Sequence, residues 1–161
     1  MDHLDEIEAA WRRERPDVDV APLVLVGRLL RASVLADAEL TRGLAGFDLQ
    51  PGWFDLLAAL RRAGEPYELH PTELMSATML SSGGMTKRLD RLVEAGLVAR
   101  RPDPADRRAT LVRLTARGRK TIDKALPVHV ANEDRLLATL NAKEREALDA
   151  LLRKLFAALN A

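Results

Sequence analysis

The spacing of apolar residues predicts a chain that is mostly helical. Leu4, Ile7 and Trp11 fall at helical intervals and predict a short amphipathic helix near the N-terminus. This helix is expected to end before Pro16, because the residue that precedes a proline is pushed out of helical geometry. A long helix with one apolar face is expected next, from about 22 to 44.

Three shorter helices are expected in the middle of the chain, over 53–63, 71–77 and 83–95. Glycines directly follow the first and the third, as is typical of helix ends, and a proline occupies the first position of the second. Ser81 or Ser82 is expected to cap the third helix. The inward stripe of that helix consists of Met85, Leu89, Leu92 and Val93.

Two short apolar runs, at 97–99 and 111–114, predict β-strands. The segment 102–108 between them contains two prolines together with acids and arginines, which predicts an antiparallel hairpin with a long polar tip. A long helix capped by Thr115 is expected to follow, with a kink at Pro127.

This order of helices and strands is the plan of a winged helix-turn-helix. We therefore predict a mainly α fold with a small β-hairpin wing, in a single domain. The winged helix-turn-helix is expected over 51–119, and the helical regions 1–46 and 120–161 are expected to form a dimerisation region. The helix that ends at Ala95 would be the recognition helix, because a major groove admits one α-helix.

The terminal helices carry more apolar surface than a lone winged helix needs. The last helix begins at a capping box of Asn141 and Glu144, and apolar residues recur along it at helical intervals from Leu148 to Leu159. Burying such stripes against a two-fold mate is the economical solution, so a homodimer is expected. The alternative is an intramolecular helical subdomain.

Composition excludes several classes of protein. The chain has 161 residues, of which 47% are hydrophobic and 30% are charged, and this suits one folded domain rather than a disordered chain. The absence of cysteine excludes disulfides, thiolate metal sites and cysteine nucleophiles, and no cofactor is expected. No apolar run approaches the roughly 20 residues that span a bilayer, and the N-terminus lacks a signal peptide, so we expect a cytoplasmic protein.

Charge is unevenly distributed along the chain. Between Gly83 and Lys120 there are eleven basic and four acidic residues, a net charge of +7, whereas the whole chain has +1 and the remainder therefore −6. A basic block in an otherwise acidic chain indicates a surface that binds a polyanion, while a solvated charged face is the simpler alternative. The block coincides with both the recognition helix and the wing, which favours DNA.

Individual residues of this block are expected to contact DNA. Gly83 lacks a side chain, so the start of the recognition helix can approach a phosphate closely. Arginines at the wing tip can enter a narrow minor groove, where the negative potential is strong, and Asp106 can orient one of them. The predicted DNA-contacting residues are Ser82, Gly83, Thr86, Lys87, Arg91, Asp106, Arg107 and Arg108.

The sequence resembles the MarR family of bacterial transcriptional regulators over about residues 22–159. The resemblance is carried by LSSGGMTKRLDRL at 80–92, EAGLV at 94–98, DPADRR at 103–108 and VRLTARGR at 112–119. It implies a homodimer that binds a palindromic operator, usually as a repressor, and that a small molecule releases. In relatives, the residue that matches Arg108 enters the minor groove and the one that matches Asp106 holds it.

The N-terminal extension resembles the urate-responsive branch of that family. The branch has a four-residue signature: a tryptophan on the added helix, an aspartate before the helix-turn-helix, and arginines on the recognition helix and at the start of the wing. The matching residues here are Trp11, Asp55, Arg88 and Arg100. One departure is His70, where relatives more often have serine or threonine. Histidine is a poorer helix cap than serine, so the helix over 71–77 is expected to be held less firmly.

These four residues suit a planar anion such as urate. An arginine can pair bidentately with such a ligand, and an indole offers a face for stacking. A ligand that binds Arg88 would displace the recognition helix, and an ion pair between Asp55 and Arg100 would couple the wing to the dimer scaffold. In the simpler alternatives, Trp11 packs in a dimer seam, the ion pair is structural and Arg88 contacts a phosphate.

Other functions fit the sequence less well. The three histidines are scattered, and the motifs HExxH, GxSxG, GxGxxG and the P-loop are absent, so an enzyme is not expected. A winged helix used only for protein contacts would not need the basic surface and would show no salt-dependent DNA binding. A phenolic carboxylate or an oxidant is an alternative effector, although peroxide sensing through a thiol is excluded without cysteine.

Overall fold

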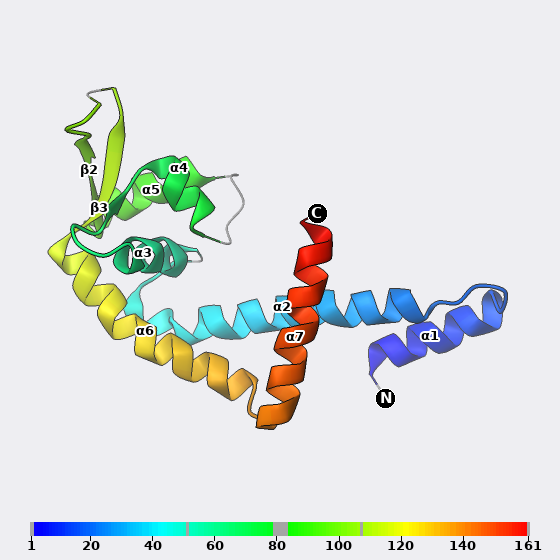
Figure 1. Cartoon of the computed structure of the whole chain (residues 1–161). Helices are drawn as coiled ribbons and strands as arrows, with labels where there is room; N and C mark the ends of the chain where they lie inside the picture. Colours follow the sequence, from blue (N-terminus) through cyan, green and yellow to red (C-terminus); the bar gives the residue numbers. More distant parts are fainter. Residues whose placement is uncertain (1, 51, 79–83, 107, 161) are drawn as a thin grey trace. The chain divides into compact units, whose positions relative to one another are not determined.

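The computed structural model describes residues 2–50, 52–78, 84–106 and 108–160. The chain divides into two compact units, Met1–Arg42 and Gly43–Ala161, shown in Figure 1 and described separately below. In these described ranges, no helix combines the length and the apolar character needed to cross a membrane.

The first unit consists of α1 (His3–Glu14) and most of α2 (Ala21–Gly43), as the apolar spacing predicted. The carboxylate of Asp2 caps α1 by accepting the N–H groups of Leu4 at 2.9 Å and Asp5 at 3.0 Å. The same carboxylate lies 3.1 Å from the guanidinium of Arg28, which holds the pKa of Asp2 below its ordinary value. Charge therefore joins the start of α1 to α2.

The second unit confirms the expected mainly α fold with a β-hairpin wing. Three short helices lie beside a small sheet, and the long helix that follows the sheet leads away from it toward the last helix (Figure 1). The elements are η1 (Ala45–Phe47), α3 (Trp53–Arg62), β1 (Glu68–Leu69), α4 (Pro71–Ser76), α5 (Met85–Glu94), β2 (Val98–Pro102), β3 (Thr110–Leu114), α6 (Ala116–Leu136) and α7 (Ala142–Leu159).

The sheet contains one strand more than the sequence predicted. Its order is β1-β3-β2, and both neighbouring pairs are antiparallel. The wing is the hairpin of β2 and β3, in which Arg100 lies opposite Val112. The added strand β1 has only two residues, with Glu68 opposite Arg113, and two residues are too few to show an alternating pattern.

The recognition helix starts later than the sequence predicted. Its N-cap is Gly84 and its first residue is Met85, while Ser81 and Ser82, the predicted caps, lie outside the described ranges. Gly84 has a φ of 82°, in the left-handed region that glycine occupies without steric cost. The left-handed turn at Gly84 therefore sets the start of the helix.

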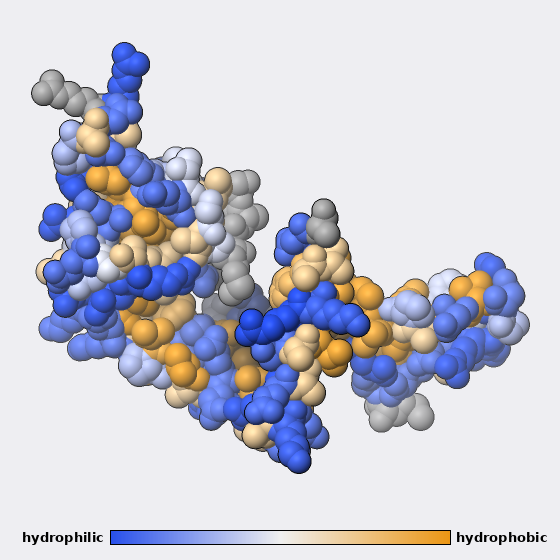
Figure 2. Space-filling view, in the orientation of Figure 1, coloured by the Kyte–Doolittle hydropathy of each residue, from blue (hydrophilic) through white to orange (hydrophobic). Residues whose placement is uncertain are grey.

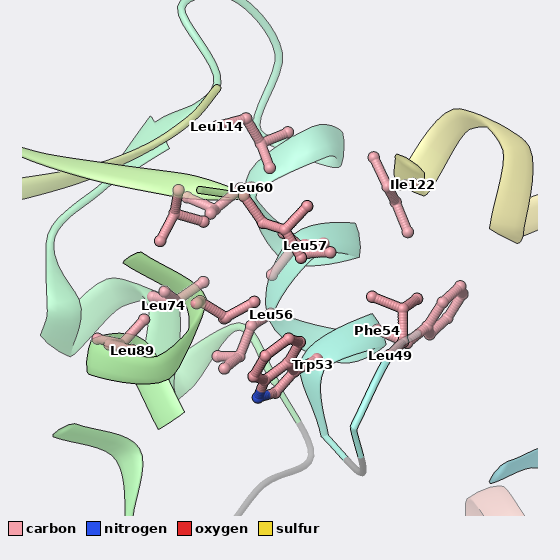
Figure 3. Packing of buried hydrophobic residues seen from close by; sticks show 14 of the residues in the cluster. Leu49, Trp53, Phe54, Leu56, Leu57, Leu60, Leu74, Leu89, Leu114 and Ile122 are labelled. Atoms are coloured by element: carbon pink, nitrogen blue, oxygen red, sulfur yellow. The ribbon is translucent and has the colours of Figure 1, made fainter. Parts of the chain in front are cut away.

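Helix α3 is the centre of the hydrophobic core. Leu56, Leu57 and Leu60 have no exposed surface, and Ile122 of α6 is equally buried. Figure 3 shows how the side chains of α3 and its neighbours gather in one cluster. Because this core fixes α4, α5 and the sheet around α3, it holds the recognition helix and the wing in one frame.

Helix α6 begins in tight contact with the wing. The Thr115 hydroxyl caps α6 by accepting the Gly118 N–H at 2.9 Å. A Cβ added at Gly118 would lie 1.9 Å from the Leu97 carbonyl oxygen, so only glycine lets the helix approach the backbone this closely. Pro127 lies inside α6, which continues on both sides of it.

Candidate nucleic-acid interface and ligand pocket

Helix α5 has one buried and one exposed face. Met85, Leu89 and Leu92 are buried, and they anchor the helix on the core. Thr86, Lys87 and Arg91, which the sequence predicts to contact DNA, are exposed. The helix therefore presents polar and cationic side chains on a rigid support.

The tip of the wing is closed by its own backbone. The Asp103 N–H donates to the Ala109 carbonyl at 3.0 Å, and the Ala109 N–H donates to the Asp106 carbonyl at 2.9 Å. The carboxylate of Asp106 accepts the backbone N–H of Arg108 at 2.9 Å. Asp106 thus orients the chain at Arg108, and both residues are exposed.

Three of the predicted DNA-contacting residues lie outside the described ranges. They are Ser82, Gly83 and Arg107.

The four residues of the predicted ligand signature lie on different helices and strands. Trp11 is on α1 in the first unit, and its exposed fraction is 45%. In the second unit, Asp55 is in the first turn of α3, Arg88 is on α5 and Arg100 is on β2. Asp55 and Arg88 are half-buried, whereas Arg100 is exposed.

Arg100 forms an ion pair with a different carboxylate from the one proposed in the sequence analysis. Its Nη1 lies 2.7 Å from Oδ1 of Asp90, on the recognition helix, whereas the sequence suggested Asp55. The reason is topological, because β2 directly follows α5 and packs against it. This ion pair joins the first strand of the wing to the recognition helix.

A pocket of about 300 Å³ lies against the recognition helix. Gly84, Lys87, Arg88 and Arg91 line it, and they share one face of α5 because they are three, four and seven positions apart. The guanidinium of Arg88 turns back toward the start of the helix, with Nη1 3.5 Å from where a Cβ on Gly84 would be. Three cations therefore line a single hollow.

The opposite wall of this pocket comes from α3 and the loop before it. Trp53 is the first residue of α3, and Gln50 accepts a hydrogen bond from Nη1 of Arg91 at 3.2 Å. The sequence predicts that Trp53 lies in a helix but does not predict a role for it in the site. The sequence shows only an indole directly after a Pro-Gly pair at the start of a helix. The tertiary structure shows that this indole lines a pocket together with residues of α5.

A second charged cluster lies at the base of the wing. Arg101 of β2 reaches across β3 to Glu68 of β1, with Nε 2.8 Å from Oε2 and a second bond from Nη2 to Oε1. The hydrogen bonds from Arg101 hold the pKa of Glu68 below its ordinary value. Over the described ranges, no group of three or more histidines and carboxylates is placed to hold a metal ion.

The fold, together with the cations Lys87, Arg88 and Arg91 on α5, defines a winged helix-turn-helix transcriptional regulator. The sequence profile of the MarR family matches residues 47–109. The regulator PecS of Dickeya dadantii (strain 3937) is 39% identical over 92% of this chain and 90% of its own length. The chain belongs to the MarR family, whose members among its relatives are regulators and not enzymes, and it is similar to the PecS-like branch.

Solved structures of the family agree with this assignment. MarR from Escherichia coli, as a Cys-to-Ser mutant in complex with operator DNA, has a TM-score of 0.74 at 30% identity, covering 86% of this chain and 99% of that one. BpsR from Bordetella bronchiseptica, whose DNA binding is regulated by 6-hydroxynicotinic acid, has a TM-score of 0.72 at 32% identity, covering 81% and 91%.

Proposed function

We propose that two copies of this chain bind a palindromic operator and repress transcription, and that a small planar anion, with urate as the first candidate, releases them. The observation that carries the ligand part is the pocket on α5. Its lining includes Arg88 of the ligand signature together with Lys87 and Arg91, the cations expected to contact DNA. A ligand and a DNA phosphate would then compete for the same charges.

DNA binding would use α5 in a major groove and the wing in the adjacent minor groove. Thr86, Lys87 and Arg91 are exposed on α5, and Arg108 is exposed at the wing tip. The proposed contacts also include Asp106, which orients Arg108, and the positions Ser82, Gly83 and Arg107. A two-fold dimer would place its two recognition helices about 34–36 Å apart, one turn of the duplex.

The dimer is supported by apolar surface that the single chain leaves open. Large apolar side chains are exposed on α2, α6 and α7, and Figure 2 shows apolar atoms at the surface of these helices. The exposed fractions reach 70% at Leu25, 66% at Leu151 and 73% at Leu159. Exposed apolar surface along a helix marks an interaction site, and a second copy covers such surface economically. We therefore propose that 1–46 and 120–161 form the dimerisation region.

The chemistry of the pocket favours a flat anion. Guanidinium groups pair with carboxylate or enolate oxygens, and the indole of Trp53, which is 6% exposed, is part of the pocket lining. The ligand of BpsR, 6-hydroxynicotinic acid, is also a small heteroaromatic acid, which supports this class. A coupling of about 1–3 kcal/mol between ligand and DNA would reduce DNA affinity about 5–150-fold.

The two tryptophans of the chain provide a direct test. Wild-type protein is titrated with urate, and with salicylate as a phenolic carboxylate, while indole fluorescence and the release of a bound duplex are followed. The duplex is one that the protein selects from a random pool. We expect urate to quench fluorescence and to release DNA over the same concentration range.

Single-tryptophan variants show which indole meets the ligand. If the pocket on α5 is the site, Trp11→Phe retains the quenching and Trp53→Phe loses it, and if the signature tryptophan stacks on the ligand the reverse holds. Arg88→Ala should lose the response, whereas Lys120→Ala, an exposed cation of the same basic segment outside the pocket, should keep it. If neither compound affects DNA binding, the proposed ligand class is overturned, whereas the assignment as a DNA-binding regulator stands.

A further inference from the structure

The carboxylate of Asp103 holds two parts of the molecule at once. Its Oδ1 accepts the backbone N–H of Ala105 at 2.8 Å, within the turn that forms the wing tip. Its Oδ2 lies 3.1 Å from Nε2 of His70, which is the N-cap residue of α4. The Asp103 side chain is only 13% exposed, so the contact is shielded from water on most sides.

His70 therefore connects the helix-turn-helix to the wing tip. On the helix side, its backbone N–H donates to the Glu73 carboxylate at 2.8 Å, which ties the histidine to the first turn of α4. On the wing side, Asp103 closes the tip through its N–H to the Ala109 carbonyl. Arg108 lies within this closed turn, one residue before Ala109.

The charges around this contact are mixed. Glu68 of β1 is near enough to Asp103 for the two carboxylates to repel each other. Arg101 of β2 and Arg113 of β3 both attract Glu68 and balance part of this negative charge. The carboxylate of Asp103 attracts the imidazole of His70 more strongly when that imidazole carries a positive charge.

We infer that His70 is a positioning residue for DNA binding, which holds the wing tip and thereby Arg108 through Asp103, and which does so more firmly when its imidazole is protonated. The inference rests on the proposed function. The contact with Asp103 is an ion pair only when the imidazole is protonated, so a lower pH strengthens the hold.

The test is the pH profile of operator affinity in wild type and His70→Thr. Threonine caps a helix well, so this variant keeps the start of α4 while it removes the charge. From about pH 8 to about pH 6, wild type should gain about two- to fivefold more affinity than the variant does, as expected for a partly exposed ion pair. His3→Ala, which removes an exposed histidine of α1, should retain the wild-type profile.

Two further variants separate positioning from a general loss of stability. Asp103→Asn should flatten the pH profile as His70→Thr does, and the double variant should show no additional loss. In an Arg108→Ala background, His70→Thr should change affinity at neither pH, because the wing arginine it positions is gone. Thermal unfolding of each variant is recorded at both pH values as a check that the fold is retained.

The outcomes distinguish this inference from the proposed function. A wild-type protein that fails to bind any selected duplex overturns the proposed function and this inference with it. A wild-type protein that binds DNA, with a pH profile that His70→Thr leaves unchanged, overturns only the role of His70. Additive losses in the double variant would also overturn it, since the two residues would then act separately.

Discussion

Helices α3 and α7 both carry leucines at helical spacing, but their surroundings differ completely. Six of the ten residues of α3 are buried, whereas none of the 18 residues of α7 is. On α7, Leu151 is 66% exposed and Phe156 is 61% exposed. The apolar face of α3 is covered within the chain by α6, α4 and the sheet.

The difference shows that an amphipathic pattern specifies a face but not what covers it. The gain from burying apolar surface is the same whether the partner belongs to the same chain or to another. The winged helix-turn-helix satisfies its helices internally and forms a rigid unit. The terminal helices retain an open face, and we propose that a second copy closes it. Four predictions test this comparison, beginning with the largest expected effect.

Removing a buried side chain from α3 should strongly destabilise the folded chain. Leu57 on α3 has no exposed surface, and Leu57→Ala is expected to lower the free energy of unfolding by about 2–5 kcal/mol through lost burial and a residual cavity. Chemical denaturation followed by circular dichroism measures this change. Leu57→Met, which nearly conserves volume, should cost less than about 1.5 kcal/mol. Equal losses in the two variants would show that the packing around Leu57 is not decisive.

A charge on the exposed apolar face of α7 should weaken the association of two copies without unfolding the winged helix-turn-helix. Phe156→Arg is expected to weaken the dimer by about 2 kcal/mol, roughly thirtyfold in dissociation constant, because an exposed aromatic residue of this kind anchors an interface. Analytical ultracentrifugation measures the association, and circular dichroism checks the fold. Lys154→Ala, a polar position on the same helix, should leave the association unchanged. A Phe156→Arg protein with wild-type association would exclude α7 from the interface.

Close packing inside the second unit should make one glycine indispensable and leave another replaceable. Gly118→Ala would bring a Cβ to 1.9 Å from the Leu97 backbone oxygen and is expected to cost about 1–3 kcal/mol. Gly46 has nothing within 4 Å, and Gly46→Ala should change stability by less than about 1 kcal/mol. Thermal melts of the two variants provide the comparison. Similar melting temperatures would mean that α6 can shift away from the wing at little cost.

Removing an ion pair from the sheet should lower the stability more than removing one from the exposed helix α7, and both effects should be smaller than those above. Because Arg101 lowers the pKa of Glu68, their ion pair stabilises the folded state at neutral pH, and this contribution is lost as the pH falls through the lowered pKa. Glu68→Gln should therefore lose about 1 kcal/mol at neutral pH and converge with wild type in acid.

The matched control for this ion pair is an exposed ion pair on α7. The pair of Arg153 and Asp149 on α7 has side chains that are 77% and 62% exposed, so Asp149→Asn should change stability very little at any pH. Denaturation across a pH series measures both variants. A Glu68→Gln deficit that persists unchanged in acid would show that the effect is steric rather than electrostatic.

The sequence predicted most of the fold because its signals are local. Apolar spacing located the helices, the glycine at 96 marked the end of the recognition helix, and the apolar runs around a proline-rich tip located the wing. Helix α5 starts at Met85, after a left-handed turn at Gly84, whereas the sequence predicted a start at about 83. Strand β1 was missed because its pairing with β3 is a contact between distant segments.

For the site, the sequence by itself determined which residues carry charge and on which helix or strand each one stands. Only the tertiary structure decided which groups meet: Arg100 with Asp90, Trp53 with the cations of α5, and His70 with Asp103. The physical reason is range. A helix or a turn is fixed by neighbours a few positions away, whereas an ion pair or a pocket depends on how whole helices and strands pack, and on side chains that reach only a few ångströms.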